Sequence, residues 1–457
     1  MIQLKRFQET TILNSIATTG YPVWKTPFPT VIICNNNIVY KTNSERVKKL
    51  ILSKGFPEED IDAFFEHLAA LVVCHDCDDN KSLYNNSMDV KIFSALEDFN
   101  YDINELMMEL AHPCGRMIKK CYWKSDLKNC DRLFKSIKTS LGYCCAFNYF
   151  ATVDVQYENY EKQLQYSGGF GLGSGLQVVV NVEPSEYVSS VKTATGVEIL
   201  VGGVYQFAEM GLYSHSLNNG QVLNIGLYPT IYGSHEDLKY INDESRGCWF
   251  PNEGSGRWSK TYNSLTCFNE CKATFIYEIC GCVPFYYSFS GIRKVCTVRD
   301  TTCILNNESL FAQIMMTNDP KEDSEFLDHH QITYSKLCYC LPGCEDTSYD
   351  IYKNTKEVAH LTNTCTVNVH FTAITGTYMI RTVHVTWDTL LATIGGIFGL
   401  CMGGSIISIV ELIFLFFNTC FKMKNQRDKN RRFDNKIRNI KIISRPYPVG
   451  DVKEFIQ

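Results

Sequence analysis

The chain has 457 residues, of which 45% are hydrophobic and 21 are cysteines, and its formal net charge is −5. This length is too great for one small domain, so the chain must bury a substantial core. Only an oxidising compartment keeps cysteines at this density as disulfides, so the composition excludes the cytosol for the cysteine-rich part of the chain.

The first third of the chain predicts a strand followed by helices. Residues 22–40 contain proline-punctuated turns and then a β-branched strand. From Ser44 to about Arg132, helical patterning dominates. The apolar residues that recur there at the spacing of one helix face are Val47, Leu50, Ile51, Phe64, Phe65, Leu68, Leu71, Ile103, Leu106, Met107 and Leu110.

The next segment, residues 142–235, is strand-like. Its clearest apolar runs lie at 177–182 and 222–227. The Gly-rich stretch 168–175 lacks the Gly-x-Gly-x-x-Gly spacing of a phosphate-binding loop and no helix follows it, so it predicts a turn before a strand.

The cysteines from Cys248 to Cys344 have roughly mirrored spacing. Cys-x3-Cys and Cys-x-Cys lie near the beginning of this block, and Cys-x-Cys-x3-Cys lies at its end. This pattern is expected when successive disulfides join two antiparallel segments. Repeated Cys-x-x-Cys pairs, which favour zinc, are absent, and the lone Cys74-His-Asp-Cys77 is more typical of a structural site. No metal or cofactor is therefore expected.

A long apolar segment at residues 390–421 predicts a membrane helix. A strand at 367–371 leads into it, and the segment exceeds the ~20 residues that a helix needs to cross a bilayer. Glu411 is its only charged residue. An acid inside a membrane is a functional-site candidate, because a carboxylate there is costly unless it faces water or a partner.

Small residues gather at the centre of the same segment, and two interpretations are open. Gly395-x3-Gly399 and Gly399-x3-Gly403 are patterns that let helices pack closely in any membrane oligomer. Alternatively, Gly403-Gly404-Ser405 provides a narrow ring of oxygens that partly replaces the hydration shell of a small cation. Glu411 favours this second interpretation, a water-filled pore.

The charge distribution predicts the topology. Residues 422–457 hold 11 Lys/Arg and 4 Asp/Glu, which leaves 33 basic and 45 acidic residues ahead of them. Basic residues directly after a membrane helix mark the cytoplasmic side, where they face anionic lipid far more often than nucleic acid. The glycosylation sequons at Asn85 and Asn307 also precede the membrane helix. We therefore expect a plasma-membrane protein with residues 1–389 outside.

The N-terminus predicts that an upstream element is missing. Met1-Ile-Gln-Leu-Lys-Arg contains no apolar region of a signal peptide, and no second hydrophobic run of sufficient length precedes Leu390. We expect an upstream membrane helix that this chain does not contain.

Several motifs then occur in order along nearly the whole chain. They are Phe28-Pro-Thr-Val-Ile-Ile-Cys34-Asn, Gly142-Tyr-Cys144-Cys-Ala-Phe147-Asn148, Arg246-Gly-Cys248, Tyr262-Asn-Ser264-Leu-Thr-Cys267-Phe-Asn-Glu-Cys271, Cys280-Gly-Cys282, Cys338-Tyr-Cys340-Leu-Pro-Gly-Cys344, and Leu390-Leu-Ala-Thr-Ile-Gly-Gly396 through Glu411. In these motifs the chain resembles the epithelial sodium channel/degenerin family, and most closely its insect pickpocket branch.

The resemblance implies an α+β fold in which a disulfide-rich extracellular domain is divided into palm, β-ball, knuckle, finger and thumb. The finger would cover about 44–135 and the thumb about 246–346, within an extracellular domain of residues 1–389. The transmembrane pore helix at 390–421 and the basic cytoplasmic tail at 422–457 would follow. Family subunits have two membrane helices, and the first is missing from this chain.

The implied function is a subunit of a trimeric, voltage-independent, amiloride-sensitive sodium channel, gated by a ligand or by mechanical load. Its partners would be sodium ions, the lipid membrane and homologous subunits, with no nucleic acid and no cofactor. The family's filter residues match Gly403, Gly404 and Ser405. Its degenerin gate position falls on Ala392, and the pore-mouth position tied to amiloride block falls on Gly399.

The resemblance also implies disulfide pairs. Those of the thumb are Cys248–Cys344, Cys267–Cys340, Cys271–Cys338, Cys280–Cys303 and Cys282–Cys296. The palm and finger pairs are Cys34–Cys144 and Cys121–Cys130. No partner is assigned to Cys74, Cys77, Cys114, Cys145 or Cys365.

The chain departs from the family in two respects. The family's His-Gly gating dipeptide is absent, and no histidine precedes His67, so proton gating by the usual residues is not expected.

The alternative function is a non-conducting, single-pass surface receptor or a dominant-negative subunit. An enzyme is not expected, because no nucleophile–base pair is readable in the sequence. The gating stimulus is not readable either.

Overall fold

The structure is a computed structural model. It describes residues 12–72, 87–152, 164–192, 194–209, 214–253, 258–259, 261–287, 293–317, 336–358, 363–384, 387–402 and 406–443. The chain divides into two units after Val383. Residues 12–383 make up the larger unit, and the described residues from His384 onward belong to the other.

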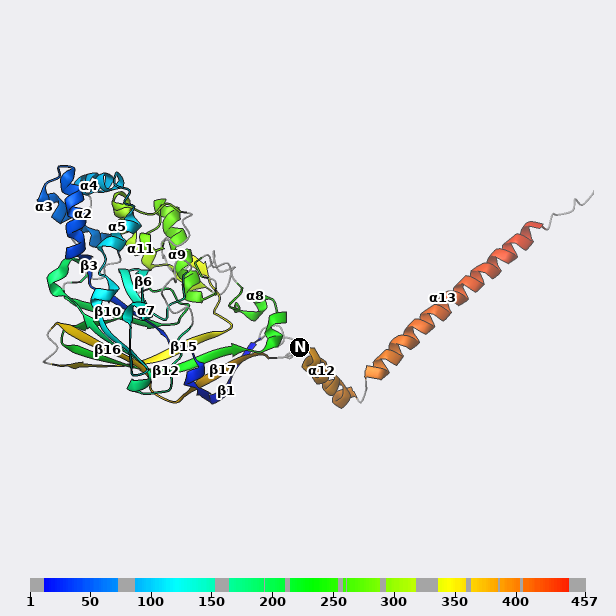
Figure 1. Cartoon of the computed structure of the whole chain (residues 1–457). Coiled ribbons are helices and arrows are strands. Elements are labelled where there is room, and N and C mark those ends of the chain that lie inside the picture. The colour runs from blue at the N-terminus through cyan, green and yellow to red at the C-terminus, as the bar shows by residue number, and fades with distance from the viewer. Residues whose placement is uncertain are drawn as a thin grey trace, which may run out of the picture. The chain divides into compact units, whose positions relative to one another are not determined.

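The larger unit is built around a large mixed β-sheet (Figure 1). Its strand order is β1-β17-β12-β16-β8-β4-β5, and β15 pairs with the other edge of β12. The bounds are β1 (Ile12–Pro22), β4 (Ile118–Trp123), β5 (Asp126–Lys128), β8 (Leu176–Asn181), β12 (Gln221–Ser234), β15 (Asp346–Glu357), β16 (Thr364–Phe371) and β17 (Thr375–Val383). Strands β1 and β17 are antiparallel, so Ile12 lies opposite Val383.

A second sheet has the order β11-β10-β2-β7-β6. Its bounds are β2 (Thr30–Asn35), β6 (Phe134–Thr139), β7 (Gly142–Phe147), β10 (Gly196–Gly202) and β11 (Ser214–Asn218). Two short pairs complete the strands: β3 (Asn37–Tyr40) with β9 (Tyr187–Ser190), and β13 (Met315–Thr317) with β14 (Leu337–Tyr339).

Strand β2 is buried on both faces, which explains its continuous apolar sequence. Successive side chains of a strand point to opposite faces. Val31 and Ile33 accordingly belong to the core that also contains Phe28, whereas Ile32 and Cys34 belong to a second core under the helices. The strand predicted within 22–40 is therefore confirmed, and its position between two cores explains why it does not alternate.

Helices cover the second core. They are α2 (Lys41–Ser53), α3 (Glu58–His67), α4 (Ser87–Glu97) and α5 (Ile103–Leu110). Helices α6 (Cys114–Met117) and α7 (Cys130–Leu133) instead place Met117 and Leu133 in the first core. The predicted helix faces are confirmed, with Val47, Ile51, Phe64 and Leu106 fully buried. The helical prediction up to Arg132 is wrong for residues 118–128, which form the hairpin of β4 and β5 before α7 begins; a disulfide joins Cys121 of β4 to Cys130 of α7.

The remaining α-helices of the larger unit lie between β12 and β15. They are α8 (Asp243–Arg246), α9 (Ser264–Cys280), α10 (Thr301–Asn306) and α11 (Glu308–Ala312). The short 3-10 helices are η1 (Val23–Lys25), η2 (Leu68–Leu71), η4 (Leu172–Ser174), η5 (Pro184–Glu186), η6 (Glu236–Tyr240), η7 (Phe285–Tyr287) and η8 (Val298–Asp300). The predicted turn at 168–175 corresponds to η4 and leads into β8, as expected.

Helix α9 and strand β14 explain the mirrored cysteine spacing. Residues four apart lie on one face of a helix, and residues two apart lie on one face of a strand, over similar distances. Cys267 and Cys271 of α9 therefore pair with Cys340 and Cys338 at β14 in antiparallel order. Helix α9 begins at an Asn263 cap, whose side chain accepts hydrogen bonds from two backbone N–H groups, and it ends at Gly281, which has a φ of 70°.

The structure contains all seven disulfide pairs that the family resemblance implied. It also pairs Cys114 with Cys145, two residues that the sequence left without a partner. Cys144 and Cys145 are adjacent on β7, so they point to opposite faces, and Cys144 bonds Cys34 in the other core. Cys365 is a buried free thiol. Cys74 and Cys77 lie outside the described residues.

The C-terminal segment is helical. Helix α12 covers Trp387–Met402, and α13 covers Ile406–Ile443. The predicted strand at 367–371 is part of β16, but β17 follows it before the helices begin. Among the described residues, no helix combines the length and the apolar character that a membrane span requires. The span predicted for 390–421 includes residues 403–405, which lie outside the described residues, so it stays a prediction.

Candidate functional site

The predicted pore residues lie on or between the two C-terminal helices. Ala392 and Gly399 are exposed on α12, and Glu411 is exposed on α13. The predicted filter, 403–405, lies outside the described residues. A methyl group added at Gly395 would meet no described atom within 4 Å apart from its chain neighbours and the backbone of its own helix. The close helix packing considered for this glycine therefore needs a neighbour other than the described segments.

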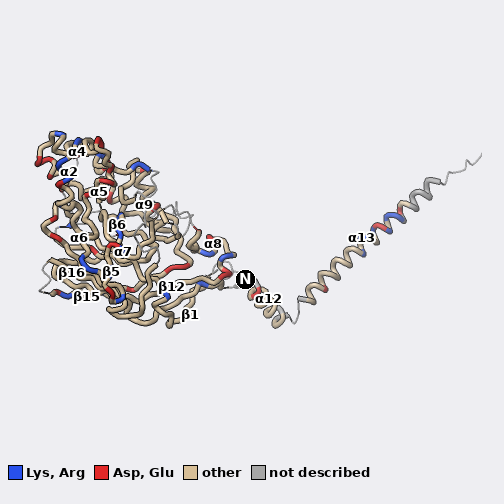
Figure 2. Tube along the Cα trace, in the orientation of Figure 1, with Lys and Arg blue, Asp and Glu red and all other residues tan. Residues whose placement is uncertain are grey.

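Helix α13 changes character along its length. Large apolar side chains are exposed from Ile407 to Phe421, and Glu411 is the only charge between Ile406 and Phe421. Lys422 begins a second half in which charged residues are frequent, as Figure 2 shows. Around Glu411, the side chains of Ile407, Val410, Phe414 and Leu415 line a shallow pocket of about 470 Å³.

Strand β17 is the last element of the larger unit before α12, and Arg381 is its only charged residue. The Arg381 guanidinium donates through Nη1 to the Gly343 carbonyl at 2.7 Å. It also lies over the Tyr232 ring of β12, 5.7 Å from the ring centroid. The backbone carbonyl of Arg381 accepts from the His235 N–H at 2.9 Å. Arg381 therefore joins β17 to β12 and to the residue before Cys344.

Cys344 closes the cysteine-rich block, which we call the bridged segment (residues 248–344). Its disulfide to Cys248 joins the two ends of this segment. The Cys344 carbonyl accepts a hydrogen bond from the Ser234 hydroxyl of β12 at 2.8 Å. The base of the bridged segment is thus tied both to β12 and, through Gly343 and Arg381, to β17.

Burial perturbs the charges at this junction. The protein around Arg381 removes water and lowers the pKa of its guanidinium, which the nearby Asp346 partly restores. Asp346 touches solvent on one side, yet the protein around its carboxyl raises its pKa by desolvation. The Thr347 N–H and Arg381 act in the opposite direction on that carboxyl. Within the described residues, Arg381 Nε is buried and has no hydrogen-bond partner.

A second arginine, Arg246, organises the entry to the bridged segment. It is 3% exposed, and its guanidinium donates to the carbonyls of Leu238, Ile241 and Cys248 and to the Glu253 carboxylate. Three backbone carbonyls and one carboxylate satisfy the buried charge, which otherwise would be costly. This explains why arginine stands two residues before Cys248.

Aromatic contacts complete the base of the bridged segment. The Trp249 ring meets the rings of Tyr262 and Tyr339 at centroid distances of 5.0 and 5.6 Å. Its Nε1 donates to the Asp243 carboxylate at 3.2 Å. Sequence reasoning named Arg246 only as part of a motif and missed Arg381 and Trp249. The available signal for Arg381 was one charge in an otherwise uncharged strand.

Comparisons with known proteins agree with the predicted family. A family model described as amiloride-sensitive sodium channel matches residues 1–415. The chain is 27% identical over 326 residues to pickpocket protein 11 of Drosophila melanogaster, covering 68% of this chain and 56% of that protein. It is 24% identical over 426 residues to pickpocket protein 28 of the same species, covering 85% and 66%.

A nematode relative extends the comparison. Degenerin del-1 of Caenorhabditis elegans is 24% identical over 327 residues, covering 68% of this chain and 45% of that protein. The chain thus spans 56%, 66% and 45% of the lengths of these three relatives. Members of the matched family are ion channels and not enzymes. Because the match covers residues 1–415 of 457, the chain belongs to the amiloride-sensitive sodium channel family.

Proposed function

We propose that this chain is a subunit of a voltage-independent, amiloride-sensitive sodium channel in the plasma membrane. The observation that carries this proposal is the family match, which includes both the cysteine-rich unit and the segment with the predicted pore residues. Residues 390–421 would span the membrane, residues 1–389 would lie outside, and residues 422–457 would lie in the cytoplasm. The excess of 11 basic over 4 acidic residues in 422–457 supports this orientation.

The proposed pore forms around the threefold axis of a homotrimer or heterotrimer of family subunits. Gly403, Gly404 and Ser405 would each appear three times there, so every position contributes a ring. Glycine permits close backbone approach, and the Ser405 hydroxyl adds an oxygen to the filter. Ala392 would be the gate, Gly399 the pore-mouth position for amiloride, and Glu411 an acid that faces water or a partner.

The bridged segment and its disulfides would form the thumb, within the proposed limits of about 246–346, and α2 to α5 would belong to a finger at about 44–135. Asn307 is half-buried, and its side-chain amide donates a hydrogen bond to the Cys303 carbonyl at 2.8 Å. Asn85 lies outside the described residues. Glycosylation of both asparagines is part of the proposal.

The contacts of Arg381 suggest how the extracellular domain would act on the pore. A movement of the bridged segment displaces Gly343, which is bonded to Arg381 on β17. Strand β17 ends at Val383 and α12 begins at Trp387, so only residues 384–386 lie between this junction and the proposed gate helix. A ligand or a mechanical load on the bridged segment would therefore reach α12 through β17.

Whole-cell recording tests the proposal. The chain is expressed alone and with pickpocket protein 28, and sodium current is measured with and without amiloride. We expect an amiloride-blocked current whose reversal potential changes towards that of potassium in Ser405→Ala. The matched control is Thr419→Ala, which removes a hydroxyl that donates to the Leu415 carbonyl within α13.

Two outcomes would overturn parts of the proposal. Unchanged selectivity in Ser405→Ala would remove this residue from the filter. Suppression of the partner's current without any altered selectivity, together with surface delivery of this chain, would favour the alternative of a non-conducting or dominant-negative subunit.

A further inference from the structure

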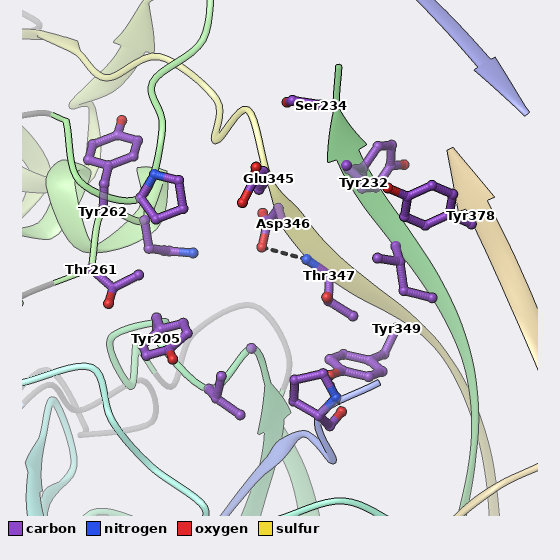
Figure 3. A pocket seen from close by; sticks show the side chains of 17 residues that line it. Tyr205, Tyr232, Ser234, Thr261, Tyr262, Glu345, Asp346, Thr347, Tyr349 and Tyr378 are labelled. Carbon is purple, nitrogen blue, oxygen red and sulfur yellow. Dashed lines mark hydrogen bonds between the residues drawn. The ribbon is translucent and has the colours of Figure 1, made fainter. Parts of the chain in front are cut away.

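A cavity of about 410 Å³ lies between the base of the bridged segment and strands β12 and β15 (Figure 3). Seventeen of the described residues line it. They include two acids, Glu345 and Asp346, and none of these seventeen is a lysine, arginine or histidine. Five of the lining residues are tyrosines: Tyr205, Tyr232, Tyr262, Tyr349 and Tyr378. The described lining residues therefore combine aromatic rings with two acidic side chains.

Several of the tyrosines are fixed in place. The Tyr349 hydroxyl donates to the Pro27 carbonyl at 2.8 Å, and the Tyr262 hydroxyl donates to the Leu341 carbonyl. Tyr378 stacks on Tyr21 with the ring centroids 5.2 Å apart. A methyl group on Gly233 would come within 2.1 Å of the Tyr378 hydroxyl, so only glycine leaves room for this ring. The aromatic wall is thus formed before any ligand binds, which lowers the entropy cost of binding.

Asp346 places a carboxylate in the same cavity. Its Oδ1 accepts from the Thr347 N–H at 2.8 Å, and within the described residues its Oδ2 accepts no hydrogen bond. Figure 3 shows Asp346 and Thr347 between Tyr262 and Tyr205 on one side and Tyr232 on the other. Arg381 is a nearby positive charge. Its guanidinium lies over the Tyr232 ring and acts on the Asp346 carboxylate, while its Nη1 donates to the Gly343 carbonyl, but Arg381 is not among the lining residues.

We infer that this cavity binds a small organic cation that carries a quaternary ammonium group on a short apolar body. Aromatic faces attract organic cations, and a carboxylate with a free oxygen supplies the opposite charge. A bare sodium ion is a poorer occupant, because its ligands are oxygens and five of the lining residues are aromatic. The volume lies within the range of about 300–1,000 Å³ that is typical of small-molecule sites.

The two walls belong to different parts of the fold, which gives the site a consequence beyond binding. Tyr262 comes from the bridged segment, whereas Tyr232 and Tyr349 come from the large sheet. A bound cation would hold these walls together at the junction where Arg381 meets Gly343. The inference concerns binding and does not depend on whether the chain conducts sodium.

The test uses the whole chain in lipid nanodiscs and saturation-transfer NMR. The two probes are choline and 3,3-dimethyl-1-butanol, which has the same shape but no charge. We expect choline to bind and the neutral alcohol to bind at least about tenfold more weakly, since only the cation gains from the rings and the carboxylate. Equal binding of the two probes to the unmodified chain would overturn the inference.

Substitutions locate the site. Asp346→Asn removes the charge with little change of shape, and we expect it to weaken choline binding about tenfold. Asp350→Asn is the matched control, because Asp350 is exposed on the same strand and does not line the cavity. Tyr205→Leu removes one ring, and its control is Tyr352→Leu, a residue 61% exposed outside the cavity. Choline binding that is unchanged in both Asp346→Asn and Tyr205→Leu, or weakened equally by the controls, would refute the site.

Discussion

Removal of the Cys271–Cys338 bridge tests whether neighbouring disulfides stabilise the bridged segment independently. These cysteines are 67 residues apart, and the neighbouring pair Cys267–Cys340 is 73 apart. A single bridge that closes a loop of 67 residues corresponds to about 4.4 kcal/mol of unfolded-chain entropy. In the unfolded chain, however, the Cys267–Cys340 bridge already holds the two ends of this loop close together.

With Cys267–Cys340 in place, the second bridge closes a much smaller circuit. It runs from Cys267 to Cys271 along α9 and from Cys338 to Cys340 at β14. A circuit of about eight residues corresponds to about 2.5 kcal/mol in the loop-entropy relation. We therefore expect Cys271→Ser/Cys338→Ser to lower the free energy of unfolding by about 2.5 kcal/mol, and to reduce surface expression.

Urea unfolding of the purified chain in detergent, followed by tryptophan fluorescence, measures this loss. The controls are the two single variants, each of which removes the same bridge and should cost as much as the double variant. A loss of about 4.4 kcal/mol or more would show that the bridges act independently. If the loss in the double variant equals the sum of the losses in the two single variants, the pairing of Cys271 with Cys338 is refuted.

Three further changes give separate expectations. Ala392→Phe should obstruct closing and give a constitutive, amiloride-blocked sodium current, whereas an unchanged resting current would remove Ala392 from the gate. Arg381→Met should lower the free energy of unfolding by about 1–3 kcal/mol, because it leaves the Gly343 carbonyl without its donor, and denaturation of the purified chain checks this. Burial raises the pKa of Asp89, so the folded chain binds this proton at higher pH than the unfolded chain does. Stability should therefore fall as the pH rises from 3.8 through the raised pKa, and a pH series of denaturation curves should lose this slope in Asp89→Asn.

Local patterns in the sequence predicted the elements that depend on local spacing. The helix faces at Val47 and Phe64 follow from periodicity, and the strand around Ile33 follows from its β-branched residues; all three are buried. The mirrored cysteines predicted an antiparallel ladder, although they did not reveal that α9 supplies one side and β14 the other. Cysteines four residues apart on a helix and two residues apart on a strand are separated by similar distances. They therefore form the same disulfide ladder as two segments of one type would, and the spacing does not distinguish the two cases.

Features that depend on distant pairing were missed. The bond between Cys114 and Cys145 follows from the position of β7 between two cores, which no local pattern shows. The pairing of β1 with β17 joins the two ends of the larger unit. The five tyrosines that line the cavity come from five separate places in the chain, so its composition becomes visible only in the fold.

The pairing of β1 with β17 has a mechanical consequence. Ile12 and Val383 form the terminal pair of an antiparallel ribbon, so forces that spread these ends apart load the hydrogen-bonded pairs one after another, as in a zipper. A force that draws both ends in one direction loads the whole ribbon together. The ladder is regular from Ile12 to Ile16 and is interrupted before Thr18, so we expect spreading to open five pairs as one step and then to stop. Force spectroscopy with handles at the two ends should record this step, and a single continuous opening to Pro22 would contradict it.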